Sequence, residues 1–171
     1  TIKFYKIWND WLVMNQELLN KVSQKIKDEL ICSLKDEATN LVFGKGNPNA
    51  EIMFLGEAPG AKEDEQGMPF VGKAGKDLDK QLNTINLTLD DVYIANILKY
   101  RPPKNRDPKP EEMENHTPYL VEQIKIIKPK VICTLGNFST KYILANGNVK
   151  AMKKIAGVDA LHGEIQEIEF R

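Results

Sequence analysis

The chain has 171 residues, enough for one domain with a buried core, and 42% of them are hydrophobic, as is ordinary for a globular protein. Its 24 basic and 24 acidic side chains cancel, which excludes a general polyanion-binding surface and leaves only a local one. No apolar run of about 18 residues and no signal peptide is visible, and neither of the two cysteines lies in a CxxC pair. We therefore expect a cytoplasmic protein without a membrane span, folded as a single domain over residues 1–171.

Predicted helices and strands alternate along the chain. Apolar residues recur every three or four positions over 5–31, which predicts a long amphipathic N-terminal helix. Three apolar runs of strand length follow, namely EIMFLG from Glu51, VYIANIL from Val92 and KVICTLG from Lys130. Helical periodicity follows each run, at 75–85, 110–128 and 137–146. Apolar strands that alternate with helices are typical of a parallel sheet covered on both faces, so we predict an α/β fold of three layers, α/β/α, with a central parallel sheet.

A glycine-rich, acidic segment, GEAPGAKEDEQGMPFVGKAG, follows the first predicted strand. Ligands bind beyond the carboxyl ends of the strands in such sheets, so we expect the functional site here. Part of the segment, GMPFVGKA, is close to the P-loop pattern, but Ala74 stands where a hydroxyl must reach Mg²⁺. The carboxylates in the segment have no His or Cys nearby, which favours a solvated loop over a metal site. They are Glu57, Glu63, Asp64 and Glu65.

Two residues near the predicted strand ends suit a flat, neutral ring. Phe70 lies between glycines and a proline in GMPFVG, where its ring can stack on a nucleobase. Asn96 ends the second strand, and its carboxamide can pair with the edge of a pyrimidine. The alternatives are that Phe70 anchors the loop in the core and that Asn96 caps a turn.

Taken together, these segments resemble the family 4 uracil-DNA glycosylases. The resemblance is carried by VFGKGNPNAEIMFLGEAPGAKEDEQGMPFVGKAG, VYIANILKYRPPKNRDPKPEE and PYLVEQIKIIKPKVICTLG, which come in the order of that family. It implies a uracil-DNA glycosylase-like fold and the removal of uracil from DNA by hydrolysis of the N-glycosidic bond after base flipping. The implied partner is uracil-containing DNA, and we expect a monomer.

The resemblance also implies roles for individual residues. Phe70 would lie on the face of the uracil and Asn96 would read its edge. Glu63 would orient or activate the attacking water, and Glu57 is the second candidate catalytic carboxylate. The backbone from Glu57 to Gly60 would line the pocket, which adds substrate-binding positions at Ala58, Pro59 and Gly60.

A basic, proline-stiffened loop, KYRPPKNRDPK, is predicted to bind DNA phosphates. Its four predicted DNA-binding residues are Lys99, Arg101, Lys104 and Arg106, with Lys109 as a fifth cation. The alternative is a solvated basic loop without a partner.

The sequence departs from the family at its metal site. Members of the family usually hold an iron–sulfur cluster on four cysteines, and the matching positions here are Glu29, Cys32, Tyr100 and His116. Because a thiolate-held cluster needs its ligands, we predict that the cluster is lost and that no cofactor is bound. A remnant metal site on Cys32 and His116 is the alternative, and Cys133 is expected in the core.

A second departure lies near the end of the sequence. The family has a late strand that ends in a His-Pro motif, whereas His162 here precedes the predicted strand EIQEIEF and is expected in a surface turn. Without a return strand, the sheet is expected to have an uncovered edge. Two explanations remain open: the sequence is incomplete, lacking the C-terminal strand and His-Pro loop, or the protein lacks them. The second would favour a catalytically silent protein that binds DNA or uracil, as a partner subunit for example.

Overall fold

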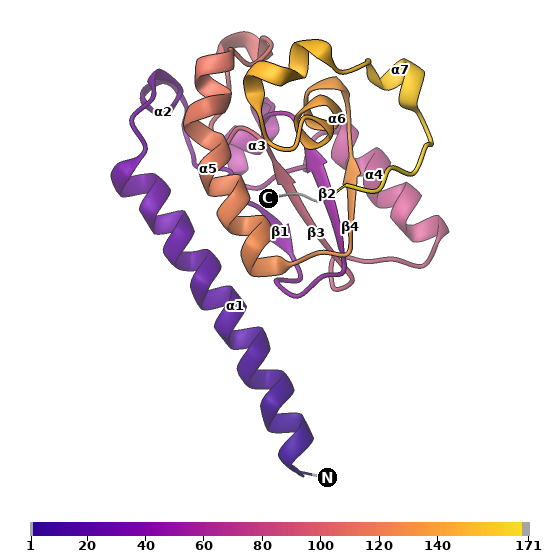
Figure 1. The fold of residues 1–171 in the computed structure, drawn as a ribbon. Coiled ribbons are helices and arrows are strands. Elements are labelled where there is room, and N and C mark those ends of the chain that lie inside the picture. Colours follow the sequence, from indigo (N-terminus) through magenta and orange to yellow (C-terminus); the bar gives the residue numbers. More distant parts are fainter. Residues whose placement is uncertain (1, 169–171) are drawn as a thin grey trace.

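A computed structural model describes the backbone of residues 2–168 and the side chains of residues 13–168 (Figure 1). The sheet has four strands in the order β1-β3-β2-β4. Strands β2 (Ile52–Gly56), β3 (Val92–Asn96) and β4 (Val131–Thr134) are parallel, as predicted. The two-residue strand β1 (Lys45–Gly46) was not predicted and pairs antiparallel with β3, so the sheet is mixed at this edge.

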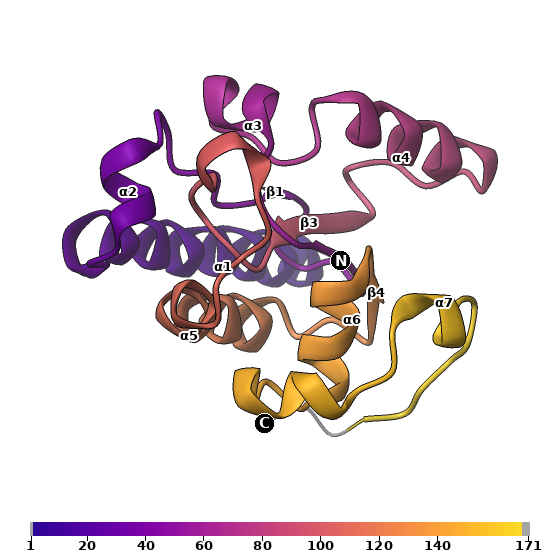
Figure 2. The ribbon, with the colours of Figure 1, turned by 90° about the horizontal axis from the view of Figure 1, so that it is seen from above.

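Helices cover both faces of the sheet, which confirms the predicted layers. Viewed from above, α4 (Lys73–Thr84) lies on one side and α5 (Pro110–Ile127) and α6 (Asn137–Leu144) lie on the other (Figure 2). Alternate strand residues face opposite layers. Met53 and Leu55 join the core formed with the α5 side, whereas Phe54 and Ile94 pack towards α4.

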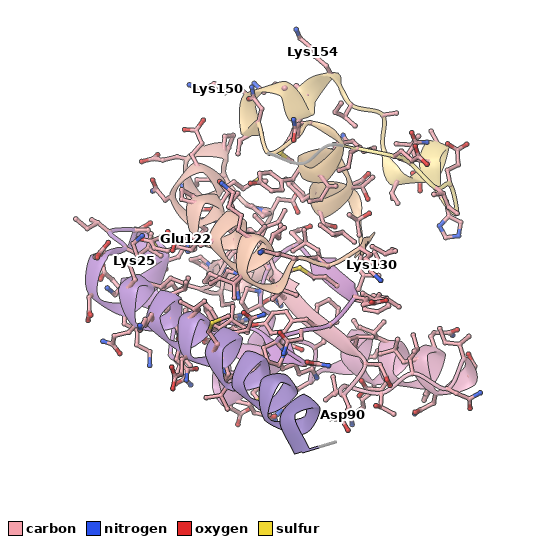
Figure 3. The ribbon with its side chains drawn as sticks, turned by 60° about the horizontal axis from the view of Figure 1, so that its bottom comes forward. Lys25, Asp90, Glu122, Lys130, Lys150 and Lys154 are labelled. Atoms are coloured by element: carbon pink, nitrogen blue, oxygen red, sulfur yellow. The ribbon has the colours of Figure 1, made fainter. Side chains whose placement is uncertain are left out.

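The long N-terminal helix α1 (Ile2–Glu29) packs along α5, beside the sheet (Figure 1). Leu19, Val22 and Ile26 are buried in the main core, at the spacing that the sequence predicts. An ion pair between Lys25 and Glu122, 2.6 Å apart, bridges the exposed border of the two helices (Figure 3). None of the helices in residues 2–168 is both long and apolar enough to cross a membrane.

The C-terminal part differs most from the prediction. After η2 (Val149–Lys154) and α7 (Val158–Leu161), residues 164–168 form no regular secondary structure, so the predicted strand EIQEIEF is wrong over these residues, and its last two lie outside the described part. A groove of about 880 Å³ runs between this segment and β4. Within the described residues β4 pairs only with β2, so Cys133 is half-buried at a sheet edge and not in the core. His162 is exposed at the end of α7, as expected.

Candidate active site

The predicted pocket residues meet at the carboxyl ends of β2 and β3. Gly56 ends β2 and pairs in register with Asn96, which ends β3. A Cβ added to Gly56 would lie 2.3 Å from Asn96 Oδ1 and 2.6 Å from Phe70 Cζ. The ring and the carboxamide, 26 positions apart in the sequence, therefore converge on one glycine. The absence of a side chain at Gly56 gives both groups their room.

The carboxamide of Asn96 has no hydrogen-bond partner in the described part of the chain. The residue is only 2% exposed. Among the described residues no hydrogen bond involves its side chain, although its main-chain carbonyl accepts one from Lys99. An amide has two donor hydrogens and an acceptor oxygen, so the side chain keeps its full pairing capacity for a ligand. It does not cap a turn.

The loop that carries Phe70 is fixed through its backbone. Phe70 itself has a φ of 52°, an uncommon conformation for a residue with a side chain. Lys45 Nζ donates to the Phe70 carbonyl at 3.0 Å. Gly75, in the first turn of α4, lies so close that a Cβ there would be 2.0 Å from the same carbonyl oxygen. The half-buried ring also contacts the apolar cluster beneath α4, so it anchors the loop as well as facing Asn96.

Glu63 ties the same loop to α3 (Ala61–Gln66). Its Oε1 accepts hydrogen bonds from the backbone N–H groups of Val71 at 2.9 Å and Gly72 at 2.7 Å. Partial burial opposes ionisation of this carboxyl, but the donors, Gly72 foremost, outweigh it and the pKa of Glu63 lies below its ordinary value. Glu63 is therefore a charged carboxylate of low basicity.

Glu57 lies in the opposite electrostatic environment. It follows Gly56 directly and is half-buried. Burial raises the pKa of its carboxyl, and the neighbouring charge of Asp107 raises it further. The sequence predicts both carboxylates as catalytic, and the structure separates them into a strongly ionised one and a more basic one.

The backbone from Glu57 to Gly60 connects β2 to α3. The Glu57 carbonyl accepts from Leu98 N at 3.0 Å, so it continues the pairing of β2 with β3 and is not free for a ligand. Ala58 is half-buried, Pro59 is buried, and Gly60 is the N-cap of α3. These positions thus directly follow Gly56 in the chain, and their role in lining a pocket stays a prediction.

The other carboxylates of the acidic segment point to different partners. Asp64 is buried and accepts from the N–H groups of Thr39 and Asn40. Glu65 pairs with Lys62 at 3.0 Å on the surface. In the part of the chain that the structure describes, no three His, Cys, Asp or Glu side chains gather into a metal-binding group.

Comparison with known proteins agrees with this geometry. The family model described as the uracil DNA glycosylase superfamily matches residues 43–167. The chain belongs to the uracil DNA glycosylase superfamily. A type-4 uracil-DNA glycosylase of Sulfurisphaera tokodaii is 50% identical over 141 residues, which cover 78% of this chain and 64% of that protein. One of Archaeoglobus fulgidus is 44% identical over 153 residues, covering 90% of this chain and 75% of that protein.

A different kind of relative also matches this superfamily member. The DNA polymerase of Bacillus phage SP01 is 31% identical over 140 residues, which cover 81% of this chain but only 14% of the polymerase. A segment similar to this chain thus occurs inside a much longer protein.

Three of the four positions that correspond to the cluster cysteines of the superfamily's family 4 lie together. Cys32 Sγ is 3.8 Å from His116 Nε2, and the His116 ring meets Tyr100 edge-on at 6.2 Å between centroids. His116 Nδ1 lies 2.7 Å from the Glu112 carbonyl, and burial lowers the pKa of this histidine to about 4. Glu29 is exposed at the end of α1. One thiol, one neutral imidazole and a phenol do not fit a group that requires four thiolates.

The predicted DNA-binding loop needs one correction. Lys99 is fully buried, so it cannot contact a phosphate. Arg106 forms two hydrogen bonds with the carboxylate of Glu112, which tie it to the start of α5, but its side chain is still partly exposed. Arg101 is partly exposed and Lys104 is exposed, and these two remain available at the surface.

Sequence analysis missed the residues that hold the site. Lys45, Gly56 and Gly75 act through backbone approach or through contacts between segments distant in sequence. The only available signal was their glycine-rich context, GKG, LGEAPG and GKAG, which shows where the backbone comes close but not what it approaches.

Proposed function

We propose that this protein removes uracil from DNA by hydrolysing the N-glycosidic bond. The convergence of the Phe70 ring and the Asn96 carboxamide on Gly56 carries this proposal, since together they would bound a slot for one flat base with a polar edge. Membership of the superfamily and the names of the relatives support it.

The slot suits a base that has left the DNA stack. The Phe70 ring would stack on the uracil, a contact worth about 1–3 kcal/mol. The Asn96 oxygen would accept from uracil N3–H and its NH₂ group would donate to O4, a combination that cytosine does not match. Uracil would reach the slot by flipping, which is easiest from single-stranded or mispaired DNA.

The two carboxylates suit the two needs of the reaction. The bond between C1′ and N1 breaks with its electron pair staying on uracil N1, which leaves a cation-like sugar and an anionic base. Glu63, held ionised by Val71 and Gly72, would favour the sugar cation and orient the water that adds to C1′. Glu57, with its raised pKa, would be the better acceptor for the proton that this water loses.

DNA would be held mainly through its phosphates. We assign this role to Arg101, Lys104 and Lys109, the exposed or partly exposed cations of the basic loop that form no ion pair with Glu112. Arg106 would act indirectly, because its pair with Glu112 fixes the loop to α5.

We further propose that this chain holds no iron–sulfur cluster and that packing of Cys32, Tyr100 and His116 takes its place. The test is the content of iron and acid-labile sulfide in the full chain purified under anaerobic conditions. Close to stoichiometric iron and sulfide would overturn the proposal.

A catalytically silent DNA-binding role is the second candidate. The match to a short part of the phage DNA polymerase favours it, because there a similar segment belongs to a protein named for another activity. Uracil release from a single-stranded oligonucleotide, measured with enzyme in excess, separates the two candidates. We expect release by the wild type and a loss of about 10²–10⁴-fold in Glu63→Gln. Oligonucleotide binding without release in the wild type would refute the glycosylase and support the silent role.

A further inference from the structure

Lys99 occupies an unusual position beneath the base slot. It lies three residues after Asn96, and its side chain is fully buried. Its ammonium donates to the Asn96 carbonyl at 2.8 Å, to Gln123 Oε1 at 2.5 Å and to the Phe43 carbonyl at 3.5 Å. All three acceptors are neutral, and the ion pairs of the described residues do not include Lys99.

The Lys99 contacts extend into a buried network that reaches both sides of the slot. Gln123, on α5, donates through Nε2 to the Phe43 carbonyl at 3.1 Å and to the Tyr93 hydroxyl at 3.3 Å. Two residues after Phe43, Lys45 binds the Phe70 carbonyl. The Asn96 side of the slot and the Phe70 side are therefore attached to the same short segment.

Stability alone is a poor reason for this arrangement. A buried ammonium without a counter-ion is costly, and a hydrophobic residue of similar size is often neutral or stabilising at such a site. Burial lowers the pKa of Lys99 to about 7, and in its protonated form the side chain offers three donors to three fixed acceptors and so defines the position of each carbonyl. Of the two backbone carbonyls that Lys99 binds, the carbonyl of Asn96 is the nearer, so the peptide group that follows Asn96 is the backbone group held most firmly.

We infer that Lys99 is a positioning residue that sets the direction of the Asn96 carboxamide. Because that carboxamide has no hydrogen-bond partner among the described residues, its aim depends on its backbone and on its contact with Gly56. Lys99 holds the main-chain carbonyl of the same residue and so helps fix the backbone position from which the side chain extends. The inference rests on the proposed function, because the carboxamide matters for catalysis only if it binds uracil. The position of the carboxamide can nevertheless be measured without catalysis.

The main test replaces Lys99 by Met in the full chain and uses two measurements. The NMR signals of the Asn96 NH₂ group, assigned with Asn96→Asp, report the environment of the carboxamide directly. Single-turnover uracil release reports its consequence. In Lys99→Met we expect displaced or broadened Asn96 NH₂ signals, an unfolding temperature at or above that of the wild type, and release slower by about 10–100-fold with little change in KM.

Controls distinguish positioning from a general loss of structure. Lys25→Met removes a lysine that pairs with Glu122 on the surface of α1, and it should leave both measurements unchanged. If Lys99→Met does not fold, Gln123→Leu takes its place, since it removes one acceptor of the same ammonium and should also displace the Asn96 signals. Unchanged Asn96 signals in a folded Lys99 or Gln123 variant would overturn the inference. Absence of release in the wild type would refute only the proposed function, and the NMR signals would still decide the role of Lys99.

Discussion

Gly56→Ala is the sharpest test of the base slot, because it adds one methyl group at the point where its two recognition groups meet. The new Cβ would lie 2.3 Å from Asn96 Oδ1 and 2.6 Å from the Phe70 ring. An ordinary contact begins at 3.4 Å, so both the carboxamide and the ring must retreat, each by about 1 Å. A displacement of that size can lower a rate by about 10²-fold. Gly56 does not have a positive φ, so the backbone itself accepts alanine.

The measurement is single-turnover release of uracil from a single-stranded oligonucleotide, together with thermal unfolding. We expect release to fall about 10²-fold and overpacking to lower the free energy of unfolding by about 1–3 kcal/mol. Gly157→Ala is the matched control, because its Cβ would meet only the side chain of Asn137, at 3.2 Å, next to α7. A folded Gly56→Ala protein that releases uracil at the wild-type rate would show that Phe70 and Asn96 do not hold the base together.

Two further predictions concern the basic loop. Hydrogen bonds from Arg106 lower the pKa of Glu112, so this pair stabilises the fold at neutral pH, and its contribution is lost as the pH falls from the ordinary pKa of a glutamate through the lowered one. The difference in unfolding temperature between the wild type and Glu112→Gln should therefore shrink on acidification, and a difference independent of pH would contradict the ion pair. For Lys104→Ala we expect weaker oligonucleotide binding and a salt dependence smaller by about 0.7 in log–log slope, whereas Lys62→Ala, on α3, should bind like the wild type. Equal slopes for both variants would remove Lys104 from the phosphate contacts.

Hydrophobic patterning predicted the fold well wherever burial decided it. The three parallel strands and the helices α1, α4, α5 and α6 were predicted to within a few residues, because each carries apolar residues at the spacing of its own element. The strand β1 was missed, since two residues carry no periodicity and their pairing with β3 depends on a distant segment. The strand predicted after His162 did not form over residues 164–168. Alternating apolar residues make a strand only when they pair with a neighbour, and within the described residues this segment does not pair with β4, the edge strand beside it.

The site was only partly predictable from the sequence. Positions at strand ends are fixed by the topology of a parallel sheet, so Asn96 and the loop after Gly56 could be placed together. Burial of individual charges in the basic loop could not be predicted. Lys99 and Arg106 have the same sign and lie seven positions apart, yet one turns inward to neutral acceptors and the other pairs with Glu112.

The opposite environments of Glu57 and Glu63 indicate how one short loop can supply two chemical roles. Glu63 cannot be both the anchor of the Phe70 loop and an efficient base, because the N–H donors that fix it also stabilise its charged form. Glu57 has the reverse property, since burial and Asp107 make its proton harder to lose. Glu63 is therefore suited to order the loop and to carry a negative charge, whereas Glu57 is suited to accept a proton. If so, Glu63→Gln should disturb the backbone signals of Val71 and Gly72 as well as the rate, whereas Glu57→Gln should lower the rate and leave those signals unchanged.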